Sequence, residues 1–258
     1  RPEVLERWRS RIRRAECDVT FHGAPCGTFS PLHDPQLRTI WEPAGMAFMP
    51  AEWRAHVESA NLLWDATAQL AQEQFDAGGE FVIEFPQRRY VPGTRAFWPE
   101  MAARGVASPG DMPSIRNLER DTAAARIDIA QCALGSPFQK FTTLLCSPGI
   151  AAHLQHLSAR RCTLCDRYMA HPERAAGTFA DGSSRAEASG AYPSELCRAL
   201  AAAGAACRRL PGRRLSASTT VPQRDLPATA GPSVALADEH AAADSRTPPP
   251  PHDSDGDD

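Results

Sequence analysis

The chain has 258 residues, 42% of them hydrophobic, which suffices for one large domain or for one domain with a tail. Its formal net charge of −3 gives no global argument for nucleic-acid binding, and without an apolar stretch of ~20 residues or a secretory signal we expect no membrane partner. Eight cysteines without a short repeating framework are typical of reduced thiols, so we expect an intracellular protein.

The first elements predicted in chain order are a helix, a strand and a turn. "RPEVLERWRSRIRRAEC" has apolar residues at helical spacing, with Pro2 near its start. "DVTF" is a short strand candidate that leads into the Gly/Pro-rich turn "HGAPCGTFSP". Residues 31–52 contain four prolines and are predicted as a loop, long enough to act as a lid or binding loop. A long helix is predicted from about Ala51 to Asp76, closed by "AGG".

The following elements alternate in the same way. "EFVIEF", "ARIDIAQCA" and "KFTTLLC" are predicted strands, and a short helix is predicted around Phe97 to Arg104. "SPGIAAHLQHLS" and "YPSELCRALAAAGAACRRL" are predicted helices. This alternation predicts an α/β fold with helices on both faces of a mostly parallel sheet, whose sites lie at the carboxyl ends of the strands.

The composition divides the chain into three predicted regions. Residues 1–160 form the α/β core, and residues 161–210 form a small Cys/His segment with a C-terminal helix. Proline, alanine, serine and threonine dominate beyond that point, and the end is acidic. We therefore predict that residues 211–258 are disordered.

Three turns at predicted strand ends carry the candidate site. They are "GAPCGTFS", "EFPQRR" and "CALGSPFQK", and they supply a thiol, a carboxylate and the single lysine of the chain. The three side chains are Cys26, Glu84 and Lys140. Because the ends of neighbouring strands meet at one edge of such a sheet, we expect these groups to lie together.

The three turns resemble, in the same order, the core of cytosine-5 DNA methyltransferases. "GAPCGTFS" is similar to the Pro-Cys loop of that family with its downstream serine. "FVIEFP" is similar to its strand that ends in glutamate, although Phe85 replaces the usual asparagine. "ALGSPFQKF" resembles its Gly-x-Pro-Gln segment, with Lys140 where an arginine is expected. The resemblance implies an incomplete Rossmann-like, methyltransferase-type fold.

The resemblance also implies a role for each residue. Cys26 becomes the nucleophile that adds to C6 of cytosine, which requires an ionised, exposed thiol near positive charge. Glu84 becomes the acid that faces N3, and Lys140 the cationic support. The partner is DNA, which implies a nuclear protein, and the base must leave the duplex to be reached. Nucleic-acid contacts are implied for Ser30, Arg88, Arg89 and Gln139.

The methyl donor implied by the resemblance is S-adenosylmethionine. In the family it sits on a glycine-rich turn upstream of the Pro-Cys loop. Only 24 residues precede Pro25 here, and Gly23 is the single glycine among them. With Arg1 rather than Met at the start, this predicts a fragment or a degenerate copy.

"EFP" and "LGSPFQKFTTLL" are similar to methyltransferase-like regions that lie beside reverse transcriptases in protist retroelement polyproteins. Lys140 and Thr142 then match the pattern. The alternative function is a non-catalytic nucleic-acid-binding or interaction module of a retrotransposon polyprotein. A third hypothesis, a cysteine hydrolase built on Cys26, lacks a histidine in a convincing context, since His22 is close only in sequence.

A separate Cys/His motif lies downstream of these turns. Cys162-x2-Cys165 followed by His171 has a spacing that suits tetrahedral zinc. A redox pair and plain reduced cysteines are the alternatives. The fourth ligand stays open among His153, His156 and Cys197.

Overall fold

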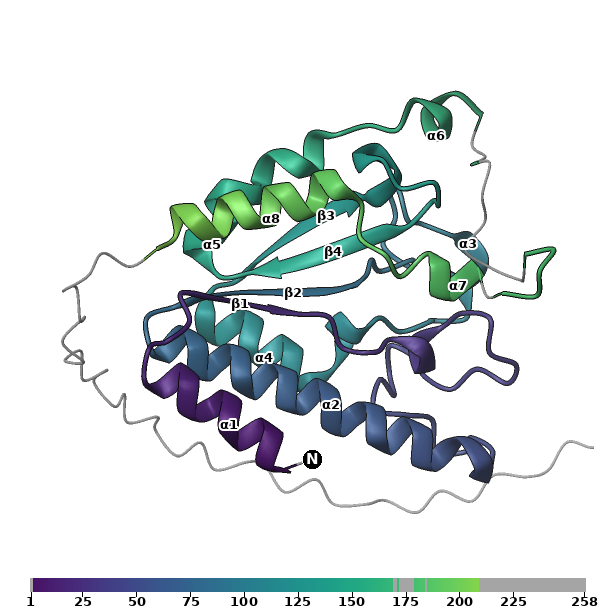
Figure 1. Cartoon of the computed structure of the whole chain (residues 1–258). Coiled ribbons are helices and arrows are strands. Elements are labelled where there is room, and N and C mark those ends of the chain that lie inside the picture. The colour runs from purple at the N-terminus through teal and green to yellow at the C-terminus, as the bar shows by residue number, and fades with distance from the viewer. Residues whose placement is uncertain (1, 169–170, 172–178, 184, 209–258) are drawn as a thin grey trace, which may run out of the picture. The chain divides into compact units, whose positions relative to one another are not determined.

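The computed structural model describes residues 2–168, 171, 179–183 and 185–208, which belong to one compact unit (Figure 1). They form an α/β fold in which helices cover both faces of a four-stranded sheet. The predicted α/β class is therefore confirmed, but the sheet is mixed rather than mostly parallel, because two of its three strand pairs are antiparallel. The tail predicted to be disordered, residues 211–258, lies outside the described residues.

The sheet is mixed, with strand order β1-β2-β4-β3. β1 pairs in parallel with β2, whereas β4 runs antiparallel to both β2 and β3. A parallel connection needs about a dozen residues or more, so the short segment between β3 and β4 returns the chain as a hairpin. The strands are β1 (Val19–His22), β2 (Glu80–Pro86), β3 (Ala125–Ala130) and β4 (Phe141–Cys146).

The direction of β4 determines what lies at one edge of the sheet. β1, β2 and β3 all end at this edge, and β4 begins there. Lys140 immediately precedes β4, and Cys26 follows β1 by a short turn. The antiparallel strand therefore brings the residue before it to the same edge as the residues that follow the parallel strands.

One face of the sheet packs against α2 and α4, with α1 outside α2 (Figure 1). Trp64 of α2 is fully buried between Phe29 and Phe85, with ring centroids 6.2 Å from each. α2 has the bounds predicted, and the chain reverses after it at Gly78, whose φ is +73°. The helices are α1 (Pro2–Arg13), α2 (Ala51–Asp76) and α4 (Pro113–Thr122).

The other face packs against α5 and α8 (Figure 1). Val82 of β2 and Leu144 of β4 point to this face and meet Leu154 and Leu196 of the helices. This second layer is α5 (Pro148–Leu154), η4 (Gln155–Ala159) and α8 (Ser194–Ala206). The shorter elements are η1 (Gly27–Phe29), α3 (Pro99–Ala103), η2 (Pro109–Asp111), η3 (Gln131–Leu134), α6 (Thr163–Tyr168) and α7 (Arg185–Ala188).

The loop predicted between β1 and α2 is ordered around Arg38, which is only 2% exposed. Its guanidinium donates hydrogen bonds to Thr28 Oγ1 (3.1 Å), Asn61 Oδ1 (2.7 Å) and the Val57 carbonyl (3.1 Å). Burial lowers the pKa of Arg38 to about 10. Since Thr28 lies in the turn that follows Cys26, one buried cation joins this turn to the loop and to α2.

Candidate functional site

Cys26 lies in the turn between β1 and η1. Its carbonyl accepts a hydrogen bond from the Phe29 amide at 2.9 Å, which closes the turn. The indole Nε1 of Trp64 donates to the Pro25 carbonyl at 3.2 Å. The half-buried thiol is thus held on a backbone fixed by the core.

Glu84 lies in β2 and is only 7% exposed. Its Oε2 accepts a hydrogen bond from the Tyr192 hydroxyl at 3.0 Å. Its Oε1 lies 3.5 Å from Lys140 Nζ and has no hydrogen-bond partner among the described residues. Buried polar atoms are nearly always bonded, so one carboxylate oxygen remains open to a further donor.

The ammonium group of Lys140 completes the group. Besides its contact with Glu84, Lys140 Nζ lies 5.6 Å from the centroid of the Tyr192 ring. This is within the range of a cation–π interaction. The single lysine of the chain therefore faces both a carboxylate and an aromatic ring.

The three residues predicted to be catalytic act on one another electrostatically. Burial raises the pKa of the Cys26 thiol, the charge of Glu84 raises it further, and the charge of Lys140 lowers it. The structure therefore brings Cys26, Glu84 and Lys140 together. The sequence predicts an ionised Cys26 thiol, but in the structure burial and the charge of Glu84 raise the pKa of the thiol by more than the charge of Lys140 lowers it. The resting thiol is protonated at neutral pH.

Tyr192 is the site residue that the sequence analysis missed. Its ring packs edge-on against Phe21 of β1, with centroids 5.5 Å apart. A Cβ on Gly23 would lie 3.0 Å from the Tyr192 oxygen, so a glycine there leaves room for the hydroxyl to reach Glu84. Burial raises the pKa of Tyr192, and the charge of Glu84 raises it further. No spacing rule links Tyr192 to Glu84, and "AYPSELC" indicates only the start of a helix.

The two arginines predicted to contact nucleic acid are engaged within the fold. Arg88 Nη2 forms an ion pair with Asp111 Oδ1 at 2.9 Å and donates to the Gly110 carbonyl at 2.8 Å. The Asp111 side chain is fully buried. The guanidinium of Arg89 lies 5.7 Å from the centroid of the Trp98 ring, and burial lowers its pKa.

Ser30 and Gln139, the other two predicted contacts, also have partners inside the protein. Ser30 Oγ accepts a hydrogen bond from the Leu32 amide at 3.3 Å. Gln139 Nε2 donates to Cys165 Sγ at 3.3 Å. Gln139 therefore connects the turn before β4 to the Cys/His motif.

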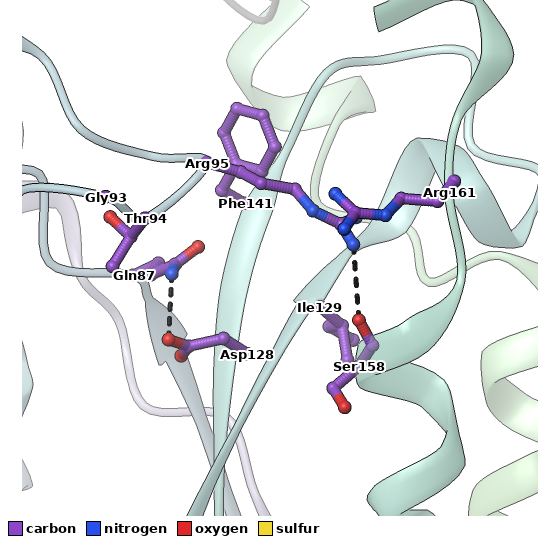
Figure 2. A pocket seen from close by; sticks show the side chains of 9 residues that line it. All are labelled: Gln87, Gly93, Thr94, Arg95, Asp128, Ile129, Phe141, Ser158 and Arg161. Carbon is purple, nitrogen blue, oxygen red and sulfur yellow. Dashed lines mark hydrogen bonds between the residues drawn. The ribbon is translucent and has the colours of Figure 1, made fainter. Parts of the chain in front are cut away.

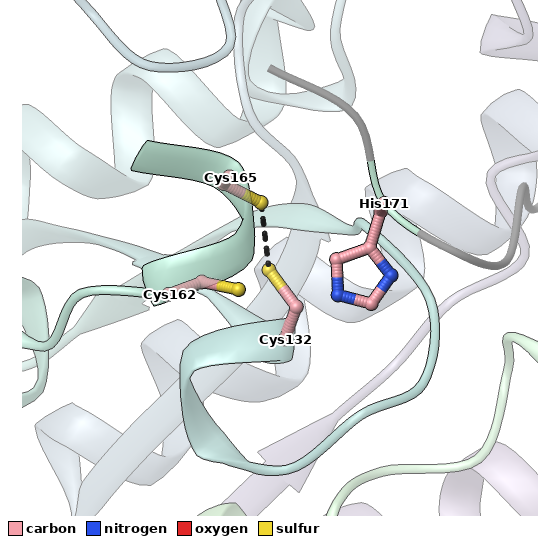
Figure 3. A group of neighbouring side chains, drawn as sticks. All are labelled: Cys132, Cys162, Cys165 and His171. Atoms are coloured by element: carbon pink, nitrogen blue, oxygen red, sulfur yellow. Dashed lines mark hydrogen bonds between the residues drawn. The ribbon is translucent and has the colours of Figure 1, made fainter. Parts of the chain in front are cut away.

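Four metal-ligating side chains gather beside this turn (Figure 3). The ligand atoms of Cys132, Cys162, Cys165 and His171 all lie within 4.8 Å of one another. Three thiols and one imidazole are a ligand set that could hold a metal ion such as zinc. Burial raises the pKa of Cys132, and its hydrogen bond with Cys165 raises it further.

The fourth residue of this group is Cys132, which the sequence analysis does not predict as a ligand. Cys132 lies in η3, the helical turn that follows β3, far upstream of the Cys-x2-Cys motif. Local spacing cannot reveal it, because only the packing of α6 against the β3–β4 connection brings it close. The group around the motif does not include the ligands considered from sequence, His153, His156 and Cys197.

A separate pocket of about 270 Å³ lies beside the β3–β4 pair (Figure 2). Gln87 Nε2 donates to Asp128 Oδ2 at 2.8 Å, and Arg95 Nη2 donates to the Ser158 carbonyl at 3.2 Å. These polar groups satisfy one another. The pocket is lined by Gln87, Gly93, Thr94, Arg95, Asp128, Ile129, Phe141, Ser158 and Arg161.

Within the described part of the chain, no helix is both long enough and apolar enough to cross a bilayer. No family model matches this chain, and comparison with curated proteins and with solved structures gave no match. Inference about its chemistry therefore starts from the residues and their geometry.

Proposed function

We propose that the chain is a cytosine-5 DNA methyltransferase-like domain that takes an extruded cytosine at Cys26, Glu84 and Lys140. The observation that carries this proposal is the convergence of these three side chains at one edge of the sheet. They come from three separate segments, the turn after β1, the strand β2 and the residue before β4, and each has the chemical type that addition to a pyrimidine ring requires.

The topology of the sheet supports the proposal at the level of the fold. β1, β2 and β3 share one direction, and β4 is inserted antiparallel between β2 and β3. Many doubly wound sheets carry an antiparallel strand on an otherwise parallel sheet.

The proposed chemistry is a reversible addition to the cytosine ring. The Cys26 thiol gives its proton to Glu84, and its sulfur forms a bond to C6 while the C5–C6 double bond opens. Glu84 passes the proton to N3, so that C5 becomes the nucleophilic carbon of an enamine. The ammonium group of Lys140 favours the thiolate and balances the charge of the carboxylate.

The described residues before Cys26 do not include the glycine-rich turn that the resemblance implies for the methyl donor. S-adenosylmethionine would need a glycine-rich turn upstream of Cys26, where the backbone can approach the ligand closely. The described segment between α1 and β1, residues 14–18, reads "RAECD" and contains no glycine. We therefore derive no methyl transfer, and the proposal is confined to cytosine binding and addition.

A second candidate is a non-catalytic nucleic-acid-binding module of a retrotransposon polyprotein. The raised pKa of Cys26 and the contacts of Glu84 favour this second candidate. Burial raises the pKa of Cys26, and Glu84 is already bonded to Tyr192 and paired with Lys140. A protonated thiol beside an ion pair can serve as a binding surface without reacting.

One experiment separates the two candidates. The chain is incubated with single-stranded DNA that carries 2-pyrimidinone in place of cytosine, a ring more open to attack at C6, and the mixture is analysed by intact mass spectrometry. The methyltransferase-like function predicts a covalent adduct that Cys26→Ala abolishes and Cys17→Ala, a change at another half-buried thiol, leaves intact.

The same samples give DNA affinity as a function of salt. Salt-dependent binding without an adduct, unchanged by Cys26→Ala, supports the non-catalytic module. A chain that neither binds DNA nor forms an adduct contradicts both candidates.

A further inference from the structure

We propose that Cys132, Cys162, Cys165 and His171 bind one zinc ion as a closed structural site that holds the β3–β4 turn in place. The sulfur positions carry the first part of the argument. Cys132 Sγ and Cys165 Sγ lie 3.6 Å apart, and a tetrahedral site with Zn–S bonds of about 2.3 Å places its sulfurs about 3.8 Å apart. The two thiols already have the separation of a zinc pair.

The histidine supplies an independent observation. His171 Nδ1 is buried and has no hydrogen-bond partner among the residues that the structure describes. Figure 3 shows its ring beside the Cys132 sulfur, facing the same space as the thiols. The nitrogen on the thiol side of the ring is Nε2, so Nε2 can serve as the fourth ligand, and Nδ1 on the far side remains a position for an outer hydrogen bond.

The ligand chemistry selects the ion and the type of site. Three thiolates and one imidazole are soft donors that favour zinc over magnesium or calcium. Four protein ligands complete a tetrahedron and leave no open position for water, as in structural sites. The site would therefore stabilise the fold and take no part in the chemistry.

The surroundings of the site connect it to Lys140. Cys132 lies near the start of the connection between β3 and β4, and Gln139 near its end. Gln139 donates to the Cys165 sulfur, the kind of outer hydrogen bond that orients a thiolate ligand. An ion at this site would fix both ends of the connection, and Lys140 follows directly.

The alternative to a metal is a disulfide between Cys132 and Cys165. A disulfide bond is about 2.05 Å long, well below the 3.6 Å between these sulfurs, and all the cysteines are free. Forming the bond would need an oxidant.

The first test is metal content. The full chain is purified under reducing conditions, given zinc and analysed by elemental mass spectrometry. We expect one zinc per chain, lost in Cys132→Ser and retained in Cys197→Ser, a change at an exposed thiol outside the cluster. Substoichiometric zinc, full zinc in Cys132→Ser, or a Cys132–Cys165 disulfide in its place would overturn the proposal.

Cobalt substitution tests the ligand set without relying on a variant that folds. Tetrahedral Co²⁺ bound to three thiolates in the unaltered chain should show strong sulfur-to-metal charge-transfer absorption. Gln139→Leu keeps all four ligands and should weaken zinc binding about 10-fold. An octahedral cobalt spectrum from the unaltered chain would contradict the closed site.

The link to Lys140 has its own readout, because the chain contains a single lysine. Lysine labelled with ¹³C at Cε gives one side-chain NMR signal. We expect this signal to shift when zinc is removed and to stay in place in Cys197→Ser. An unchanged signal on zinc removal would overturn the link. These measurements involve no cytosine, so their failure is distinct from failure of the proposed function.

Discussion

The Tyr192 hydroxyl donates a 3.0 Å hydrogen bond to Glu84 Oε2, joining the start of α8 to the middle of β2. The same carboxylate lies 3.5 Å from Lys140 through its other oxygen. Glu84 is therefore held from two sides by groups that lie far apart in the sequence. Its position depends on the packing of α8 as well as on its own strand.

Glu84→Gln should lower the pKa of Tyr192. Burial is the largest cause of the raised pKa and remains in the variant, whereas the negative charge of Glu84, the next cause, is removed. The measurement is a phenolate absorbance titration of the three tyrosines, with Tyr192→Phe identifying which transition belongs to this residue. Identical titration curves for Glu84→Gln and the unaltered chain would contradict the coupling.

His22 should make the fold sensitive to mild acid. Burial lowers the pKa of its imidazole from 6.5 to about 4. Because the folded pKa lies below the unfolded value, the stabilisation is fully present above pH 6.5 and is lost as pH falls toward 4. In urea unfolding, His22→Gln should lose less stability over this range than the unaltered chain, by on the order of 2 kcal/mol.

The control for this prediction is His153→Gln, which alters an exposed histidine on α5. It should retain the acid sensitivity of the unaltered chain. If His22→Gln and the unaltered chain lose stability in parallel, burial of the His22 ring is not the cause.

Arg38→Met should destabilise the fold by about 3 kcal/mol or more, because buried acceptors on Thr28, Asn61 and Val57 lose their donor. Arg38→Lys should rescue only part of the loss, since one ammonium group cannot reproduce the planar arrangement of donors. Urea unfolding measures both variants, with the exposed Arg54→Met as the control. A loss below about 1 kcal/mol would refute this role of Arg38.

Arg88→Gln should lower stability by roughly 1–3 kcal/mol, because it removes one partner of the buried Asp111 carboxylate. Arg120→Gln, at an exposed ion pair, should cost much less. Thermal unfolding and DNA affinity are measured on the same samples. An unchanged stability together with weaker DNA binding would instead assign Arg88 to a phosphate contact. In that case the slope of the logarithm of the DNA-binding constant against the logarithm of the salt concentration would fall in magnitude by about one.

The sequence predicts those parts of the fold whose signals are local. The helix Ala51–Asp76 has an apolar repeat and a glycine pair after it, and the strand at Glu80–Pro86 is a dense apolar run between Gly79 and a proline. The position of Cys26 follows from the same signals, because the carboxyl ends of parallel strands share an edge, whereas Lys140 reaches that edge only because β4 runs antiparallel.

The remaining parts depend on contacts between distant segments. The pattern "KFTTLLC" predicts a strand but not its direction, which the short β3–β4 connection determines. Tyr192 and Cys132 enter their groups only through the packing of α8 and α6. Arg38 lies in a proline-rich loop, where a charged residue is usually solvated, and its burial depends on acceptors from two other segments, the turn after β1 and α2.

Strand β4 pairs Leu144 with Glu84, and side chains along a strand alternate between the two faces of the sheet. A slip of this register by one residue would turn Lys140 to the opposite face. The thiol and the carboxylate would stay where they are, but their cation would be gone. The register of β4 therefore specifies the charge of the site as strictly as the identity of any residue in it.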